Sequence, residues 1–429
     1  MRLACALLLA LVLPSPARGW DRHADATRVA LTAGPGGGGR ANPLAGAVAV
    51  EPLEAFLASA GVPLAALLDA EERWARAHVP RYPPRPEALR YAPGGEGAAL
   101  RRRFLEALRV NPTVLLALPA GRQVAPLDVV ATASDEPDQG LDLGLFQDSG
   151  TPHGARYGFG PLPFGNPTLS FATQAPFHMG FYYESRFLTA LAPALLRTYP
   201  ELRIHQFAAL ARFALESGHP YWAWRFLGWG LHYVQDLTQP YHATVSPGTS
   251  VATLVGVSLL DLVGVHGPRA ERLQLLTNRH LALEAYQGAA VADALARGDA
   301  ADPLLAALRD RARDAAYAPF DDAAPRERVA AIAHEKAART DAVLAAALPA
   351  RWVKDPRHHA GATGVEMDVW GELARRGTPE ARAAMVALLR DLLADLGGAS
   401  RSYLAAVLAE GEPARRAERR GRVNRSSVR

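Results

Sequence analysis

The stretch LGWGLHYVQDLTQPYHATV, residues 227–245, combines an aromatic and apolar helix pattern with two histidines and one aspartate. Pro240 cannot continue a helix, so we expect the helix to end just before it. His232 and Asp236 are four residues apart and therefore share one face of this helix. His242 follows the turn and can point back toward the same pocket. From this stretch alone the alternatives are a metal site and a core helix that happens to carry polar residues.

A second pair of histidine and carboxylate lies downstream in NRHLALEAY, where His280 and Glu284 are also four residues apart. Taken alone, this spacing is more typical of a chance or surface pair. It gains weight after His232, Asp236 and His242, because a buried carboxylate needs a compensating positive charge and a metal can supply it. The two segments together favour a metal site.

Helical periodicity dominates the rest of the sequence, with apolar residues at i, i+3, i+4 and i+7 and no alternating strand pattern of any length. We therefore predict an all-α fold, a multi-helix single domain with long loops before the metal-binding helices. Those loops are expected over 111–176, which is rich in Gly, Pro and Asp. The predicted helices are two short ones within 51–78, broken at Gly61 and Pro63, and others over 97–110, 184–199, 201–217, 221–237, 269–297, 302–315, 325–348, 366–376 and 379–409.

Residues 1–19 have the pattern of a cleaved secretory signal peptide: a basic start, an apolar run, and Ala17 and Gly19 before the cleavage point. Cleavage would leave Trp20 as the first residue of a secreted or periplasmic protein. Retention of the run as a membrane anchor is the alternative, which the shortness of the run disfavours. Cys5, the single cysteine, lies within this segment, so the mature chain would have no thiolate metal ligand.

Charge is unevenly distributed along the chain, whose formal net charge is +4. The tail over 412–429 carries seven arginines and two glutamates, has almost no apolar residues, and is predicted to be disordered. The body over 20–411 has a net charge of −3. It therefore lacks the basic surplus expected of a protein that grips nucleic acid along a groove.

The segment TSVATLVGVSLLDLVGV, residues 249–265, is nearly continuous apolar sequence interrupted by Asp261. It is too short and too charged to be predicted as a transmembrane helix. Two interpretations are open: a buried helix, or a hairpin or lid that makes transient contact with a membrane surface.

Three features resemble the superfamily of zinc-dependent bacterial phospholipases C and fungal single-strand nucleases. A tryptophan, Trp20, follows the cleavage point. The block LGWGLHYVQDLTQPYHA is similar to the family's LG…LHY.GD..QP.HA segment, and a His-x3-Glu pair follows it. The resemblance is strong from about 207 to 243 and confined to isolated positions elsewhere. It implies a helical fold of the zinc-dependent phospholipase C type over 20–411, with insertions over 34–176 and 246–268.

The resemblance also implies three Zn²⁺ ions per chain. It assigns the first zinc to His232, Asp236 and an upstream aspartate and histidine, the second to His242, His280 and Glu284, and the third to the amino group and carbonyl of Trp20, to His23 and to a bridging Asp236. His23 departs from the family pattern, because it comes sooner after the tryptophan than is usual.

The upstream aspartate and histidine follow from the same resemblance. His178, in FHMGFYYES, matches the family's histidine, and His153 is the alternative. Asp135 is preferred over Asp138 and Asp142, because it follows small residues and precedes a proline-containing turn, as the family's ligand does. The separation of Asp135 from His178 is much longer than in the smaller family members, which implies an inserted loop.

This metal set implies a phosphodiesterase. The positive field of three zinc ions suits a phosphate diester, and zinc lowers the pKa of bound water so that hydroxide is available near neutral pH. Asp135 could also orient the attacking water. We expect a phospholipase C that hydrolyses phospholipid head-group esters. The alternatives are a single-strand nuclease or 3′-nucleotidase of the same superfamily, with nucleic acid as substrate, and a non-catalytic, metal-stabilised helical protein.

Overall fold

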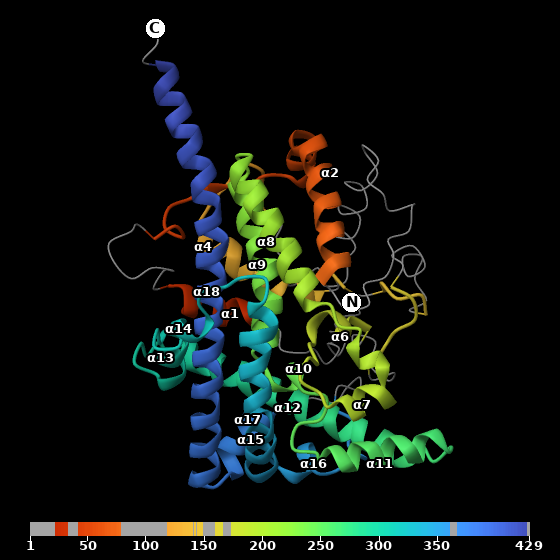
Figure 1. The fold of residues 1–429 in the computed structure, drawn as a ribbon. Coiled ribbons are helices and arrows are strands. Elements are labelled where there is room, and N and C mark those ends of the chain that lie inside the picture. Colours follow the sequence, from red (N-terminus) through yellow and green to blue (C-terminus); the bar gives the residue numbers. More distant parts are fainter. Residues whose placement is uncertain are drawn as a thin grey trace, which may run out of the picture.

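The computed structural model describes residues 22–32, 42–78, 118–139, 141–142, 144–148, 159–165, 173–360 and 367–426. Over these residues the chain is mostly helical, as the sequence predicts, and its longest helices run along the length of the molecule (Figure 1). The only strands among the described residues are two-residue segments, β1 (Val48–Ala49) and β2 (Gln123–Val124), which pair antiparallel.

The first half of the described chain comprises α1 (His23–Leu31), α2 (Leu53–His78), α4 (Pro126–Asp135), η2 (Pro137–Gln139), α6 (Ala175–His178), α7 (Arg186–Leu191), η4 (Pro193–Leu196), α8 (Pro200–Glu216), α9 (Pro220–Leu237) and α10 (Pro240–Ala243). The second half comprises α11 (Val251–Leu262), α12 (Gly267–Arg297), α13 (Pro303–Arg309), α14 (Asp314–Tyr317), η5 (Pro325–Ala330), α15 (Ala331–Ala347), α16 (Ala350–Val353), α17 (Val369–Arg376) and α18 (Pro379–Ser426).

Helix α9 is the centre of the fold, and it is buried from Trp222 to Leu237. It packs against α8, α4 and α18, so its aromatic side chains meet neighbours on all sides. Proline sets both of its limits: Pro220 opens α9, and Pro240 opens the short helix α10 that follows. Gly228 allows close approach to α4, because a Cβ atom there would lie 2.6 Å from the Val130 carbonyl oxygen.

Two apolar cores adjoin each other in the fold. One gathers side chains of α8, α9, α4 and α2. The other gathers side chains of α12, α13, α15 and α18, together with Tyr241 of α10. Helix α1 contributes to both, through Leu31 to the first and Ala30 to the second. The polar residues described below therefore lie where the two cores meet.

One expectation about secondary structure is wrong. The region over 111–176 is not only loops, because it contains α4 between Pro126 and Asp135. This helix is short, with two adjacent valines, and it is stabilised by packing on α9 and α1. Helix α18 is assigned as far as Ser426, and the disorder expected over 412–429 stays a prediction.

Most other helix predictions are confirmed, with differences in detail. The break within 51–78 is a kink at Gly61, whose φ is 32°. The segment predicted over 302–315 is divided into α13 and α14. The helix predicted over 97–110 lies outside the described residues.

The apolar segment over 249–265 forms α11, and none of the residues of this helix is buried. The interpretation as a buried helix is therefore wrong, because the first half of α12 and the short helix α7 support α11 on one side only. Within the described part of the chain, no helix combines the length and the apolar character that crossing a membrane requires.

Candidate metal centre

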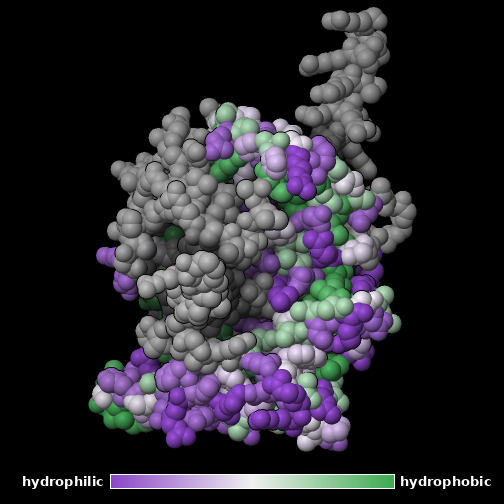
Figure 2. All heavy atoms as spheres, turned by 180° about the vertical axis from the view of Figure 1, so that it is seen from behind, coloured by the Kyte–Doolittle hydropathy of each residue, from purple (hydrophilic) through white to green (hydrophobic). Residues whose placement is uncertain are grey.

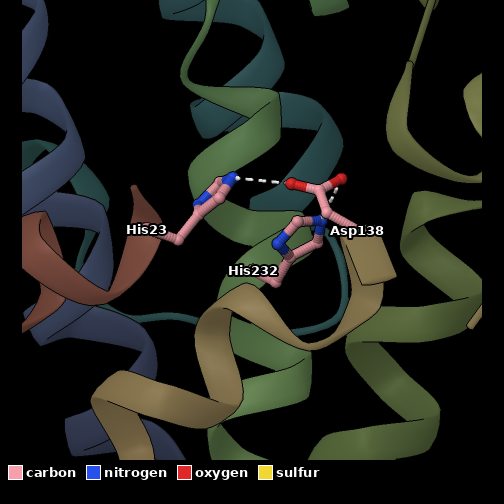
Figure 3. A group of neighbouring side chains, drawn as sticks. All are labelled: His23, Asp138 and His232. Carbon is pink, nitrogen blue, oxygen red and sulfur yellow. Dashed lines mark ion pairs between the residues drawn. The ribbon is translucent and has the colours of Figure 1, made fainter. Parts of the chain in front are cut away.

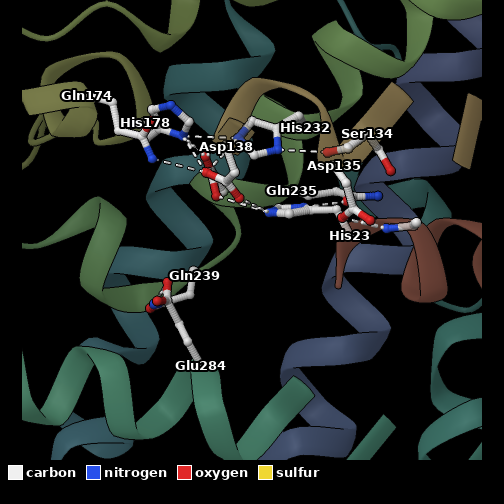
Figure 4. Close-up of polar contacts among 12 residues, drawn as sticks. His23, Ser134, Asp135, Asp138, Gln174, His178, His232, Gln235, Gln239 and Glu284 are labelled. Atoms are coloured by element: carbon white, nitrogen blue, oxygen red, sulfur yellow. Dashed lines mark hydrogen bonds and ion pairs between the residues drawn. The ribbon is translucent and has the colours of Figure 1, made fainter. Parts of the chain in front are cut away.

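Four separate elements bring histidines and carboxylates together near the C-terminal end of α9 (Figure 4). His232 and Asp236 come from α9, His23 from the start of α1, Asp138 from η2, and His178 from the end of α6. His23 and His232 are 0% exposed, and His178 and Asp236 are 4% exposed. The structure therefore collects four buried ligand-type side chains, and the partly buried Asp138, from positions far apart in the sequence.

The first group consists of His178, His232, Asp236 and Asp138. His178 Nδ1 lies 2.7 Å from Asp236 Oδ2 and 3.0 Å from His232 Nε2, which is itself 3.1 Å from Asp236 Oδ2. Asp138 Oδ1 lies 3.8 Å from His178 Nδ1 and 3.7 Å from His232 Nε2. Ligands about 2.0–2.1 Å from one zinc ion in tetrahedral geometry are roughly 3.3 Å apart. These separations fit a single ion.

His23 faces the other side of the same carboxylates, and Figure 3 shows this for Asp138. Its Nε2 lies 3.7 Å from Asp138 Oδ2 and 3.6 Å from Asp236 Oδ1. Each aspartate therefore presents one oxygen to His23 and the other oxygen to the pair His178 and His232. This is the arrangement of carboxylates that bridge two neighbouring ions.

A second group lies between α10 and α12, where His242, His280 and Glu284 converge. The Nε2 atoms of His242 and His280 are 2.9 Å apart. Glu284 Oε1 lies 3.2 Å from His242 Nε2 and 2.8 Å from His280 Nε2. His242 Nδ1 is also 3.5 Å from Asp236 Oδ1, which connects the two groups. The spacing predicted for His280 and Glu284 does place them on one helix face directed at His242.

Outer partners orient the histidine rings. Nδ1 of His232 lies 2.8 Å from the Ser134 carbonyl oxygen, and Nδ1 of His23 lies 2.8 Å from Gln235 Oε1. Because a carbonyl oxygen can only accept, each Nδ1 must carry the proton and donate. Each Nε2 is then the nitrogen with a lone pair, directed at the carboxylates, which is the tautomer that a metal requires.

Asp142 belongs to the shell behind His178. Its Oδ2 lies 3.5 Å from His178 Nε2, on the side of the ring opposite to Asp236. Arg203 Nε donates to Asp142 Oδ1 at 3.0 Å, and the Tyr233 hydroxyl donates to Asp142 Oδ2. Although burial opposes ionisation, Arg203 holds the pKa of Asp142 below its usual range. Asp142 is therefore an anion that orients His178, rather than a ligand.

The upstream aspartate predicted from the sequence was Asp135, with Asp138 as an alternative. The structure places Asp138 among the histidines, whereas Asp135 Oδ1 accepts a hydrogen bond of 3.0 Å from the backbone N–H of Ala24. Asp135 lies beside His23 in Figure 4, and its role as a ligand stays a prediction. Trp20 and His153 lie outside the described residues.

Burial sets the protonation of this centre. Burial, with the nearby His232 ring, lowers the pKa of His23 to about 3, so His23 is neutral at physiological pH. Burial raises the pKa of Asp138 to about 6. Although burial also opposes charge on His178, the Asp236 and Asp142 carboxylates raise its pKa to about 10. Without a metal, His178 carries a proton, which balances part of the buried negative charge.

A cavity of about 190 Å³ opens onto both groups. Its polar floor includes Asp138, Asp236, His178, His242 and Glu284. Its walls are apolar and come from the chain on both sides of α6, from η4, from the chain after α10 and from the first half of α12. The apolar wall residues are Phe164, Met179, Phe181, Leu195, Val245, Leu273, Leu276 and Leu281.

The donor set fits zinc, because it consists of neutral imidazoles and carboxylates at separations that a small tetrahedral ion can bridge. Three groups in the described residues bring their ligand atoms close enough to hold an ion: His23 with Asp138 and His232, His178 with His232 and Asp236, and His242 with His280 and Glu284. The first two groups share His232. Comparisons of the chain with protein-family models, curated proteins and solved structures gave no match.

Proposed function

We propose that the chain is an exported, zinc-dependent phosphodiesterase of the phospholipase C type, which hydrolyses head-group esters of phospholipids. The proposal depends mainly on one observation: two adjacent groups of buried histidines and carboxylates, joined through Asp236, form the floor of a cavity with apolar walls. A purely structural metal site would be closed by protein on all sides, whereas this one opens to a cavity.

The residues present would hold zinc at three positions. His178, His232 and Asp236 would hold the first ion with Asp138, and His242, His280 and Glu284 the second. His23 would contribute to the third, together with the amino terminus at Trp20 that the sequence resemblance implies. Bound zinc supplies a Lewis acid for the phosphoryl oxygens and lowers the pKa of water toward neutrality.

Neutral amides next to the ligands restrain the carboxylates. Gln174 Nε2 donates to Asp138 Oδ1 at 3.3 Å, and Gln239 Nε2 donates to Glu284 Oε1 at 3.3 Å. Each amide occupies a lone pair of a ligand carboxylate without adding charge. The carboxylates therefore keep their orientation whether or not a substrate is bound, which is the pre-organisation that hydrolysis at a metal site needs.

The cavity walls favour a lipid over a nucleic acid. Eight wall residues are aliphatic, aromatic or methionine, and no Lys or Arg is among the described residues that line the cavity. A nucleic-acid site would be expected to place cations along the phosphate backbone. A phospholipid instead presents one phosphodiester next to glycerol and the upper acyl carbons, which suits a polar floor with apolar walls.

Metal content and a substrate panel would test the proposal. We expect the mature protein beginning at Trp20 to contain about three zinc ions, and a form with one alanine added before Trp20 to contain about two, since a blocked amine cannot ligate. Phosphocholine release from phosphatidylcholine would be measured beside hydrolysis of single-stranded DNA. Zero or one zinc would overturn the metal assignment, and cleavage of DNA alone would favour the nuclease.

Matched variants would decide between the two candidate aspartates. Asp138→Asn and Asp135→Asn each remove one charge with little change of volume. If Asp138 is the ligand, its variant loses zinc while Asp135→Asn retains it. The reverse result would restore Asp135 to the role that the sequence predicts. Because Asp135 accepts the Ala24 N–H, its variant also serves as a control for disturbance of α1.

A further inference from the structure

Exposed apolar side chains gather on one protruding part of the molecule. Of the ten exposed large hydrophobic side chains among the described residues, eight lie on α7, on α11 or in the turn after α11. They are Phe187, Leu191, Val251, Leu259, Leu260, Leu262, Val263 and Val265. We call these eight residues the apolar prow. Figure 1 shows α11 projecting sideways from the body, and Figure 2 shows hydrophobic atoms at the corresponding lower corner.

Helix α11 exposes apolar residues where a surface helix normally exposes polar ones. Its most exposed residues are Ala, Gly, Leu and Val, at positions 251, 252, 256, 259, 260 and 262. Its polar residues, Thr253, Ser258 and Asp261, are partly covered instead. Surface helices normally show the opposite pattern, with the apolar stripe turned toward the core. An uncovered apolar surface of this extent marks a site of interaction.

Exposure rises toward the tip of the prow. Leu262 is 79% exposed and Val263 is 74% exposed, at the turn where α11 ends. On the neighbouring α7, Phe187 is 77% exposed. The surface is therefore convex, with its most apolar residues at the extremity. A protein partner would need a matching groove and usually offers aromatic or arginine anchors, whereas a lipid surface accepts a convex apolar wedge directly.

The single charged residue of α11 is neutralised by its neighbours. Asp261 lies 2.6 Å from His266 Nδ1 and 2.7 Å from Arg269 Nη1. Its carboxylate is thereby paired with groups at the start of α12. Insertion of the prow into a lipid surface would therefore desolvate no unpaired carboxylate on α11.

The prow is continuous with the cavity walls. Helix α7 leads directly into η4, which supplies Leu195 to the cavity. Helix α11 leads into α12, which supplies Leu273, Leu276 and the ligands His280 and Glu284. A lipid surface in contact with the prow would therefore lie next to the opening that leads to the metal ligands.

We propose that the apolar prow is an interfacial docking surface that seats the protein on a zwitterionic phospholipid layer and delivers lipid from it to the cavity. The inference rests on the proposed function for the identity of the substrate, and it adds the physical state in which the substrate is taken. With 12 residues, α11 is about 18 Å long and lies in the interface rather than across it.

Vesicle binding, measured separately from hydrolysis, would test whether the apolar prow docks on a lipid surface. The full mature protein is mixed with phosphatidylcholine vesicles and separated by flotation, with Leu262→Asp/Val263→Asp and Phe187→Asp as prow variants. Leu118→Asp replaces an exposed leucine elsewhere and is the matched control. We expect each prow variant to bind vesicles at least tenfold more weakly, since each loses buried apolar surface and adds a charge, while the control binds like the wild type.

A water-soluble, short-chain phosphatidylcholine separates docking from chemistry. The prow variants should hydrolyse this monomeric substrate like the wild type, and vesicle lipid about tenfold more slowly. Vesicle binding without hydrolysis of any phospholipid would overturn the proposed function and leave the prow assignment intact. Equal vesicle binding by the wild type and the prow variants would overturn the assignment of the prow as a lipid-docking surface. The assignment would also be overturned if the wild type were a dimer that does not bind vesicles and that the prow substitutions dissociate.

Discussion

Zinc binding to the metal-free protein should release protons, and the structure gives their source. Without metal, His178 is held between Asp236, 2.7 Å from its Nδ1, and Asp142, 3.5 Å from its Nε2. Burial opposes its charge, but these carboxylates raise the pKa of His178 to about 10. His178 is therefore protonated at pH 7.5 and must lose that proton to bind zinc. His23, whose pKa burial lowers to about 3, has none to release.

The expected magnitude is about one proton per chain from His178, with a further contribution from His242. Although burial opposes charge on His242 as well, Asp236 raises its pKa above the usual value. The sign is fixed: protons compete with zinc, so the apparent affinity falls as pH is lowered, by about tenfold per pH unit for each displaced proton. This dependence should extend throughout the range below the raised pKa of His178.

Calorimetric titration of zinc in buffers of different ionisation enthalpy measures the number of protons released. This number is the slope of a plot of the observed binding enthalpy against the ionisation enthalpy of the buffer. His178→Asn should lower that slope by about one proton per chain, whereas His205→Asn, a histidine paired with Asp322 outside the centre, should not change it. Deprotonation of bound water would add to every slope and cancels in the difference. Equal slopes for the wild type and His178→Asn would refute the protonation state assigned here.

Three further substitutions test the surroundings of the centre. Arg203→Met should destabilise the fold by about 3–5 kcal/mol, because it leaves the buried Asp142 without its cation, and adding Asp142→Asn should recover much of the loss in thermal unfolding. Gln235→Leu removes the acceptor of His23 Nδ1 and should weaken zinc binding roughly 10- to 100-fold, measured by competition with a chelator, with the fold retained. Gly228→Ala should lower thermal stability by about 1–3 kcal/mol, because its Cβ would strike a backbone carbonyl of α4. Each prediction fails if its variant behaves like the wild type. For Arg203→Met and Gly228→Ala the measured quantity is thermal stability, and for Gln235→Leu it is zinc affinity.

The sequence predicts the parts of the centre that lie on regular helices. His232 and Asp236, and likewise His280 and Glu284, are four residues apart, so their shared faces follow from helical geometry alone. The prolines that bound α9 made its end equally predictable. The same reasoning explains why the long helices after residue 268 were predicted correctly, because their apolar periodicity is strong.

The choice between Asp135 and Asp138 could not be made from periodicity. Asp135 is the last residue of α4, and the chain then turns at Pro137 into η2, which carries Asp138. The direction of a side chain at such a junction depends on the turn and on packing against α9. The role of Gln235 could not be predicted from the sequence either. Gln235 precedes Asp236 in the sequence, but its side chain points toward His23 and Thr27.

The location of the centre links its chemistry to the packing of the whole molecule. The first group of ligands is attached to the core around α9, while His280 and Glu284 belong to α12 in the other core. Hydrogen bonds from His242 and Gln239 to Glu284 cross this boundary and place the two groups side by side. Metal ions bound there would neutralise carboxylates that both cores bury, so metal binding should strengthen the junction as well as supply the reactive centre. Because α11 packs against α12, the junction that positions the ligands also fixes the apolar prow relative to the cavity.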